Sequence, residues 1–139
     1  RKEAVWIEEG IMSFSSRGST NSKLIKNQSD KSVSVNAISL PDLINRKVDF
    51  LKIDIEGAEY EVIKSIQDQL HFVHNLFVEY HGNFNENDQL NETFASLSKN
   101  GFSYYIKEAL SVFETPFCRP ENSEMLYDIQ LNIFCFRNN

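Results

Sequence analysis

The stretch that decides the fold is Val48-Asp49-Phe50-Leu51-Lys52-Ile53-Asp54-Ile55-Glu56-Gly57. Residues 48–55 are dense in β-branched and aromatic side chains, which predicts a central strand buried on both faces. The Glu56-Gly57 pair then ends the strand. A stripe of apolar residues at helical spacing follows, made of Ala58, Val62, Ile63, Ile66 and Leu70. The stripe predicts an amphipathic helix directly after the strand.

Downstream of this unit the same order of elements repeats. Residues 76–81 predict a second buried strand, and a helix carrying Leu90, Phe94 and Leu97 follows and ends at Asn100-Gly101. The order strand, helix, strand, helix is typical of a parallel α/β sheet with right-handed crossovers. Residues 102–107 and 128–136 predict two further strands. Because no helix separates them, we expect these two strands to be antiparallel.

The N-terminal third has weaker signals. Two short apolar stretches, 4–7 and 11–14, flank a Gly-containing turn and predict a hairpin. Residues 15–32 are rich in Ser, Asn and Lys without apolar periodicity, which predicts a mobile surface loop that is either a solvated connector or a lid. Residues 33–38 alternate apolar and polar side chains, as a half-buried strand does. Ser39-Leu40-Pro41-Asp42 then begins a short helix.

Composition narrows the class of protein. The chain has 139 residues, which predicts one domain, and 14 Lys and Arg against 20 Asp and Glu give a net charge of −6. The acidic balance, with a pI near 5.0, argues against nucleic acid as a partner. No apolar run approaches the ~20 residues that a membrane span needs. Cys118 and Cys135 are too few for a disulfide framework, so we expect reduced thiols and a cytoplasmic location.

Candidate functional residues stand at the ends of the two predicted parallel strands. Ligands of open α/β sheets bind at the carboxyl ends of the strands, where loop amides and helix N-termini converge. Asp54, Glu56 and Glu59 follow the first strand, and Glu79 and His81 end the second. If the two strands are neighbours, these side chains converge on one site.

Alternation of side chains along a strand sharpens this expectation. Lys52 and Asp54 share one face of their strand, and Glu79 and His81 share one face of theirs. The functional interpretation is an acidic pocket that takes a proton from a hydroxyl or amine, or that holds a divalent cation. The structural alternative is a buried ion pair between Lys52 and Glu79, with acids that only stabilise a helix N-terminus. We favour function for Asp54 and Glu79, because charges inside apolar strands are costly.

The eight residues Lys52-Ile53-Asp54-Ile55-Glu56-Gly57-Ala58-Glu59 resemble the signature Lys-Ile-Asp-Val-Glu-Gly-Ala-Glu of the FkbM family of S-adenosylmethionine-dependent methyltransferases. The only departure is Ile55 in place of Val. Ser39-Leu40-Pro41-Asp42-Leu43 resembles the short helix before that signature, and Val78-Glu79-Tyr80-His81 resembles the family's next strand. Lys99-Asn100-Gly101-Phe102 resembles the step into the final hairpin, so the resemblance runs from about Val33 onward.

The resemblance implies an α/β fold, namely a partial Rossmann-like methyltransferase sheet with parallel strands, crossover helices and a C-terminal antiparallel strand pair. The family's cofactor loop, an Asp-x-Gly-Ala-Asn-like turn, has no match in this sequence. We therefore expect residues 1–139 to be a single domain that forms the C-terminal part of a catalytic domain and is incomplete by itself. The strand at 48–55 would then be an exposed sheet edge, which predicts a homodimer through that edge.

The implied activity is methyl transfer from S-adenosylmethionine to a hydroxyl oxygen of a small molecule or sugar. The implied roles are catalysis for Asp54 and Glu79, cofactor binding for Asp54, Glu56 and Gly57, and substrate binding for Glu56, Glu59 and His81. We assign no metal ligand. Two alternatives stay open: a metal-dependent phosphoesterase or exonuclease that uses Asp54-x-Glu56, and a non-catalytic binding module.

Overall fold

The strands that the structure describes form two sheets. The computed structural model describes residues 3–15, 32–113, 115, 117 and 125–137, which fall into two compact units, Arg1–Asn45 and Arg46–Asn139, each with its own sheet. The predicted mobile loop lies outside the described residues except for Ser15 and Ser32, and so does Cys118. The single domain over residues 1–139 stays a prediction.

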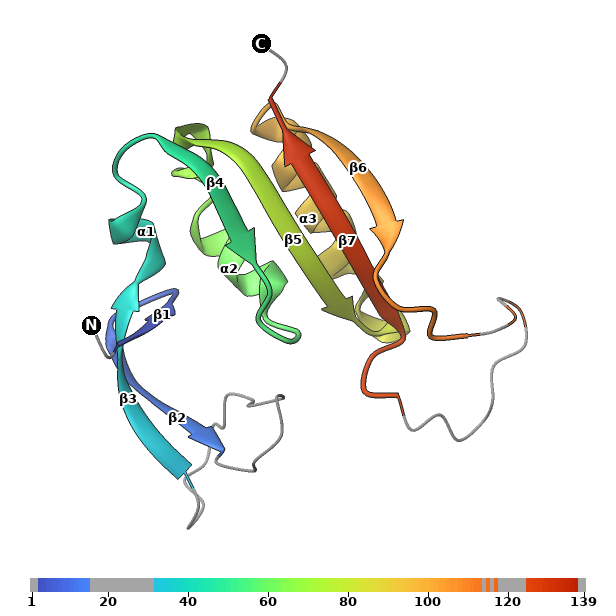
Figure 1. Cartoon of the computed structure of the whole chain (residues 1–139), viewed down its shortest axis with the longest axis horizontal. Coiled ribbons are helices and arrows are strands. Elements are labelled where there is room, and N and C mark those ends of the chain that lie inside the picture. The colour runs from blue at the N-terminus through green and yellow to red at the C-terminus, as the bar shows by residue number, and fades with distance from the viewer. Residues whose placement is uncertain (1–2, 16–31, 114, 116, 118–124, 138–139) are drawn as a thin grey trace. The chain divides into compact units, whose positions relative to one another are not determined.

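The first unit is a three-stranded sheet of β1 (Ala4–Trp6), β2 (Gly10–Ser15) and β3 (Ser32–Ser39), in the order β1-β3-β2 (Figure 1). The predicted hairpin of residues 4–7 and 11–14 is wrong, because β3 lies between these strands, parallel to β1 and antiparallel to β2. Ala37 of β3 pairs with Ala4 on one side and Gly10 on the other. All six β2 residues pair with the longer β3, which the three-residue β1 could not provide.

The short helix α1 (Leu40–Leu43) begins as the sequence predicts. Ser39 is its N-cap, and the Ser39 hydroxyl accepts a hydrogen bond of 3.4 Å from the backbone N–H of Asp42. Pro41 occupies the first turn, where a missing N–H costs nothing. The chain then enters the second unit.

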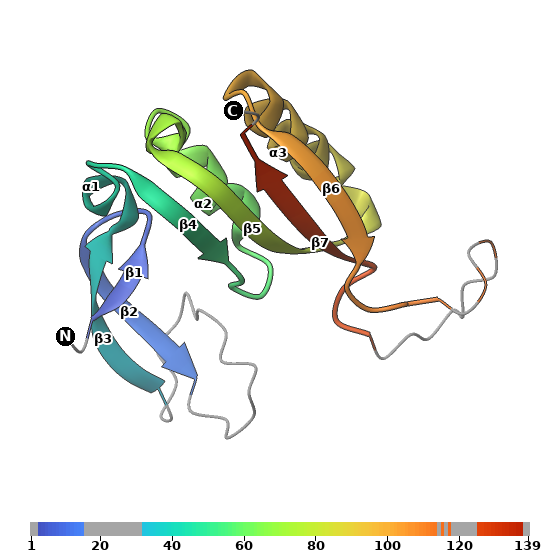
Figure 2. The same cartoon turned by 45° about the horizontal axis from the view of Figure 1, so that its top comes forward.

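The second unit is a four-stranded mixed sheet in the order β4-β5-β7-β6 (Figure 2). Its strands are β4 (Val48–Ile53), β5 (Val73–Gly82), β6 (Ser103–Glu108) and β7 (Ile129–Phe136). β4 and β5 are parallel, whereas β7 is antiparallel to both β5 and β6. The predicted parallel pair and the predicted C-terminal antiparallel pair are both confirmed.

The prediction that residues 48–55 form a central strand is wrong. β4 stands at the edge of the sheet, with Asp49, Phe50 and Lys52 exposed and only Ile53 fully buried. The cause is that β5 takes the central place, since it pairs with β4 on one side and β7 on the other. The prediction of an exposed edge along 48–55 agrees with this arrangement.

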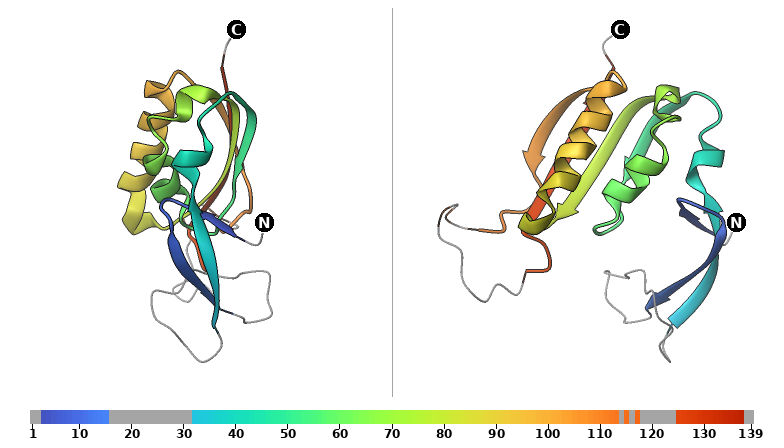
Figure 3. Two further views of the ribbon diagram at one scale, coloured as in Figure 1. Left: turned by 90° about the vertical axis from the view of Figure 1, so that its left-hand side faces the viewer. Right: turned by 180° about the vertical axis from the view of Figure 1, so that it is seen from behind.

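Two helices, α2 (Glu59–Ser65) and α3 (Asn87–Lys99), cover one face of this sheet (Figure 3). The apolar stripe after β4 is buried as predicted except for Ala58, which is partly exposed. However, α2 ends at Ser65, and the chain reaches β5 through the 3-10 helix η1 (Leu70–Phe72). A second 3-10 helix, η2 (Phe84–Glu86), leads into α3. The core combines both helices with β5 and β7 through Ile63, Ile66, Leu70, Leu76, Val78, Leu97 and Ile133, each no more than 1% exposed.

Candidate active site

The loop between β4 and α2 turns sharply at the carboxyl end of the strand. Glu56 and Gly57 have φ values of +56° and +96°, so two consecutive residues adopt the left-handed conformation. Glycine adopts this conformation without strain, whereas a side chain such as that of Glu56 disfavours it by ~1–2 kcal/mol. The Glu56 conformation therefore persists because the surrounding contacts hold it.

The carboxylate of Glu59 is the anchor of this loop. Its Oε1 accepts hydrogen bonds from the backbone N–H groups of Ile55 (3.1 Å) and Gly57 (3.2 Å). Its Oε2 accepts from the same Gly57 N–H (3.1 Å) and from the His81 N–H (3.4 Å). Glu59 is 1% exposed, so it is a buried carboxylate whose two oxygens are both occupied by protein donors. Glu59 thereby ties the β4–α2 loop to the end of β5.

The His81 ring contacts three of the acidic side chains at this end of the sheet. Its Nδ1 donates to Glu59 Oε1 at 3.2 Å, and its Nε2 lies 3.9 Å from both Glu56 Oε2 and Glu79 Oε1. Burial lowers the pKa of His81, but the hydrogen bond that its ring donates to Glu59 and the negative charges of Glu59, Glu56 and Glu79 outweigh this effect, so the pKa is raised. The imidazole is held in one orientation with Nε2 facing the carboxylates.

Asp54 completes the acidic cluster, which consists of Asp54, Glu56, Glu79 and His81. One oxygen of Asp54 pairs with Lys52 Nζ at 3.0 Å, and the Asp54 and Lys52 side chains are 29% and 55% exposed. Asp54, Glu56 and His81 each offer one potential ligand atom, and these atoms all lie within 4.8 Å of one another. The Lys52 ammonium thus faces Asp54, and the alternative of a buried pair between Lys52 and Glu79 is wrong.

Tyr127 is a site residue that the sequence analysis missed. Its hydroxyl donates to the backbone carbonyl of Glu56, and its ring lies 5.0 Å from the His81 ring. Burial, with added effects of Glu56 and Glu59, raises the pKa of Tyr127 to about 12. A Cβ on Gly57 would lie 3.0 Å from the Tyr127 ring, so the glycine is required for close packing as well as for its φ. A Tyr 71 positions after Glu56 carries no local signal of this contact.

The structure therefore brings the predicted site residues together at the carboxyl ends of two adjacent parallel strands. Asp54, Glu56 and Gly57 come from the loop after β4, Glu59 from the first turn of α2, and Glu79 and His81 from β5. Glu59 differs from the others, because its carboxylate is enclosed by the protein. The individual roles of these residues stay predictions.

Comparison with protein families identifies the domain. The model of the methyltransferase FkbM domain matches residues 7–104, well over half of the chain. The chain belongs to the FkbM methyltransferase family. No curated protein and no solved structure matches it.

The match fits the geometry of the site. It includes both strands and the loop that carry the acidic cluster of this FkbM domain, and it begins upstream of Val33, where the sequence resemblance was placed. It ends at Tyr104 within β6, so β7 and Tyr127 lie beyond it. None of the described helices is long and apolar enough to span a membrane.

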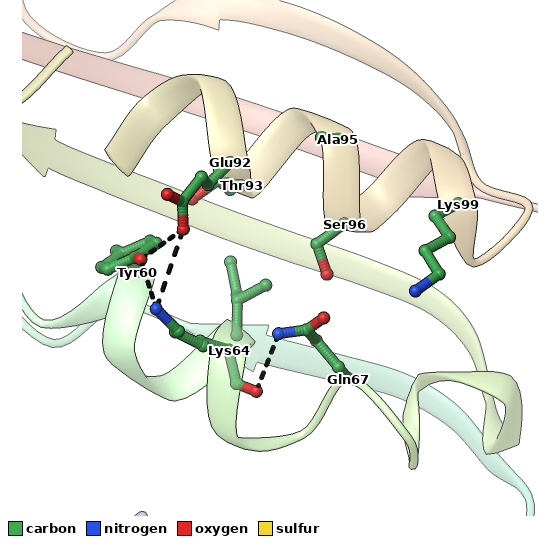
Figure 4. Close-up of a pocket in the computed structure, with 9 residues that line it drawn as sticks. Tyr60, Lys64, Gln67, Glu92, Thr93, Ala95, Ser96 and Lys99 are labelled. Carbon is green, nitrogen blue, oxygen red and sulfur yellow. Dashed lines mark hydrogen bonds and ion pairs between the residues drawn. The ribbon is translucent and has the colours of Figure 1, made fainter. Parts of the chain in front are cut away.

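The FkbM domain also has a groove of about 200 Å³ between α2 and α3 (Figure 4). At one end, the Tyr60 hydroxyl donates to Glu92 at 2.5 Å and Lys64 Nζ donates to the Tyr60 oxygen at 2.8 Å. None of the residues that line the groove belongs to the acidic cluster. The charged groups of this network satisfy one another, which is the pattern of a contact between helices.

Proposed function

We propose that the acidic cluster is the site of S-adenosylmethionine-dependent methyl transfer to a hydroxyl oxygen of a small molecule or sugar. The observation that carries the proposal is the convergence of Asp54, Glu56, Glu79 and His81 at the carboxyl ends of β4 and β5 in a chain of the FkbM family. Ligands of open α/β sheets bind at this edge. A methyl acceptor also needs a group that receives its proton, and carboxylates at this edge are suited to it.

The residues present fit S-adenosylmethionine. The cofactor supplies an electrophilic methyl group on a positively charged sulfur. The partly exposed carboxylates of Asp54 and Glu56 balance such a charge, and they accept hydrogen bonds from hydroxyl groups. The backbone of Gly57 is exposed next to these two acids. Asp54, Glu56 and Gly57 are therefore the residues that we assign to cofactor binding.

The acceptor is assigned to the β5 side of the cluster. Glu79 is 31% exposed at its side chain, so it can contact a hydroxyl group and take its proton. Asp54 is the second candidate for this role, and Glu56 and His81 line the acceptor position. Glu59 is reassigned from substrate binding to positioning, because both of its oxygens already accept hydrogen bonds from the protein. Alignment of the reacting groups provides most of the rate in such a transfer.

The remaining features of the proposal concern partners and location. The acceptor is a small molecule or a glycan, and the acidic balance of the chain argues against nucleic acid. A cytoplasmic location is consistent with Cys135, which is a free, buried thiol. The alternative phosphoesterase would use the same Asp54-x-Glu56 pair, but family membership favours methyl transfer.

The test is a methyl-transfer assay on the full-length protein. Formation of S-adenosylhomocysteine is measured with a panel of sugars and hydroxylated metabolites, and Asp54→Asn and Glu79→Gln are compared with Asp49→Asn and Glu61→Gln. The controls remove exposed acids on β4 and α2 that lie outside the cluster. We expect loss of ~10²-fold or more in the two cluster variants, the scale of a lost proton acceptor, with wild-type rates in the controls. Wild-type turnover in both cluster variants would overturn the proposal, and so would the absence of turnover with every acceptor.

A further inference from the structure

We infer that Asp54, Glu56 and His81 form a binding site for a single divalent cation of the Mn²⁺ type. The site comes from two elements, the loop after β4 and the end of β5, which the parallel pairing brings side by side. The inference on binding stands on this geometry alone. The use of the cation in catalysis rests on the proposed function.

The first observation is the set of ligand atoms. One oxygen of Asp54, one oxygen of Glu56 and one nitrogen of His81 all lie within 4.8 Å of one another. Ligands of one divalent cation sit about 2.0–2.2 Å from the metal, so a small closing movement of these side chains would bring all three atoms to coordination distance. The two carboxylates are 29% and 35% exposed, and so are free to make that movement.

The second observation concerns the His81 ring. The His81 side chain is 5% exposed, and its Nε2 points into the cluster. Among the described residues the nearest carboxylate oxygens to Nε2 are 3.9 Å away, too far for a hydrogen bond. Nε2 of this largely buried side chain therefore faces two carboxylates without a direct hydrogen bond to either. A cation within the cluster would satisfy Nε2 and the two carboxylates together.

The hydrogen bonding of the His81 ring resembles that of a metal-binding histidine. Ligand histidines donate their other ring nitrogen to a carboxylate, which fixes the ring and makes it a better ligand. Glu59 takes this place, because it accepts from Nδ1 at 3.2 Å and is itself held by backbone N–H groups. The same buried carboxylate thus orients both the ring and the loop that carries Glu56.

The ligand types indicate the class of cation. Two carboxylates and one imidazole suit a cation that accepts both oxygen and nitrogen, such as Mn²⁺, and partly exposed ligands leave coordination positions open. Lys52 is the competing charge, since its Nζ lies 3.0 Å from Asp54 Oδ2. Lys52 occupies one oxygen of Asp54 and has a side chain that is 55% exposed, so it can move away when a cation binds.

In the proposed reaction the cation would bind the acceptor hydroxyl. A bound divalent cation lowers the pKa of an oxygen ligand, so the hydroxyl gives up its proton more readily. Glu79 lies outside the ligand set and next to His81 Nε2, which makes it the carboxylate that receives the proton. Asp54 then acts as a ligand of the cation.

The test is a titration of the full chain with Mn²⁺ alone, followed by loss of the free-ion signal in electron paramagnetic resonance. The cluster variants are Asp54→Asn, Glu56→Gln and His81→Asn. The matched controls are Asp49→Asn, Glu61→Gln and His71→Asn, which change exposed residues of the same types. Circular dichroism checks that each variant is folded. The first two cluster variants change partly exposed residues, so the test stands even if His81→Asn fails to fold.

We expect one saturable Mn²⁺ site, with ~10-fold or greater loss of affinity in each folded cluster variant and no change in the controls. Lys52→Met should bind Mn²⁺ more tightly than the wild type, because a competing positive charge is gone. Equal affinity in the wild type and in both Asp54→Asn and Glu56→Gln would overturn the inference. Mn²⁺ binding in a full-length protein that transfers no methyl group would uphold this site and overturn the proposed function. Methyl transfer by a protein that binds no Mn²⁺ would overturn this site and leave the proposed function standing.

Discussion

At the scale of single residues, Glu59 occupies a position that the sequence predicts to be exposed, but its carboxylate is buried and holds the β4–α2 loop. An acid in the first turn of a helix is normally exposed and interacts with the helix dipole. Glu59 is buried because the left-handed turn at Glu56 and Gly57 directs backbone N–H groups toward its carboxylate. In the sequence, such a turn is indicated by the Glu-Gly-x-Glu spacing of residues 56–59.

The Glu59→Gln variant tests this role. We expect a loss of ~1–3 kcal/mol in the free energy of unfolding, because an amide group would place its own donors against the N–H groups of Ile55 and Gly57. Urea denaturation followed by circular dichroism measures the change. Glu61→Gln, at an exposed position of the same helix, is the control and should be neutral. A Glu59→Gln variant as stable as that control would show that the carboxylate does not hold the loop.

Gly57→Ala tests the turn itself. An alanine there has to adopt a φ near +96°, and its Cβ would lie 3.0 Å from the Tyr127 ring. We expect destabilisation of ~1–2 kcal/mol from the conformation alone. Gly10→Ala is the control, because a Cβ at Gly10 meets nothing within 4 Å. Thermal melting of both variants compares the positions, and equal melting temperatures would contradict the constraint at Gly57.

At the scale of elements, local patterns predicted the type of most segments but not their neighbours. The parallel pairing of β4 and β5 follows from a strand, a helix and a strand in sequence, because this connection constrains topology. The strand at 4–7 has no such constraint. It pairs with β3, whose residues are more than 30 positions away, so the local pattern around Gly10 led to the wrong prediction of a hairpin. Tyr127 was missed for the same reason.

The exposed edge of β4 carries a prediction for this element. A flat edge strand with an exposed aromatic residue is a template for pairing with another chain, and Phe50 is 62% exposed. We expect the chain to form a dimer, measured as a doubled mass by light scattering after size-exclusion chromatography. Phe50→Lys should shift the chain toward the monomer.

Tyr105→Lys is the matched control for this prediction. Tyr105 lies on β6, the opposite edge of the same sheet, and is 56% exposed. This variant should remain dimeric if β4 is the contact. If Tyr105→Lys dissociates the dimer and Phe50→Lys does not, the contact lies at β6 and the prediction is wrong. A monomeric wild type would also contradict the predicted dimer.

At the scale of the whole molecule, the site is assembled by the second unit, where one buried carboxylate joins a loop, a helix and a strand. The acids themselves were predictable, because polar residues at the ends of apolar strands stand out in a sequence. Their arrangement was not, since the distances around His81 depend on the turn at Glu56 and on the depth at which Glu59 is buried. In the proposed function the cofactor binds at this cluster and not in the groove between α2 and α3.

The most direct measurement is a titration of the ¹⁵N-labelled chain with S-adenosylmethionine, followed by backbone amide chemical shifts. We predict saturable shifts at Ile55, Gly57 and His81, and none at Lys64 or Ser96 in the groove. Binding should be weaker than low micromolar, because this sequence has no stretch like the cofactor loop that the family resemblance leads us to expect. Unchanged amides at the cluster, or shifts confined to the groove, would contradict the assignment of the site.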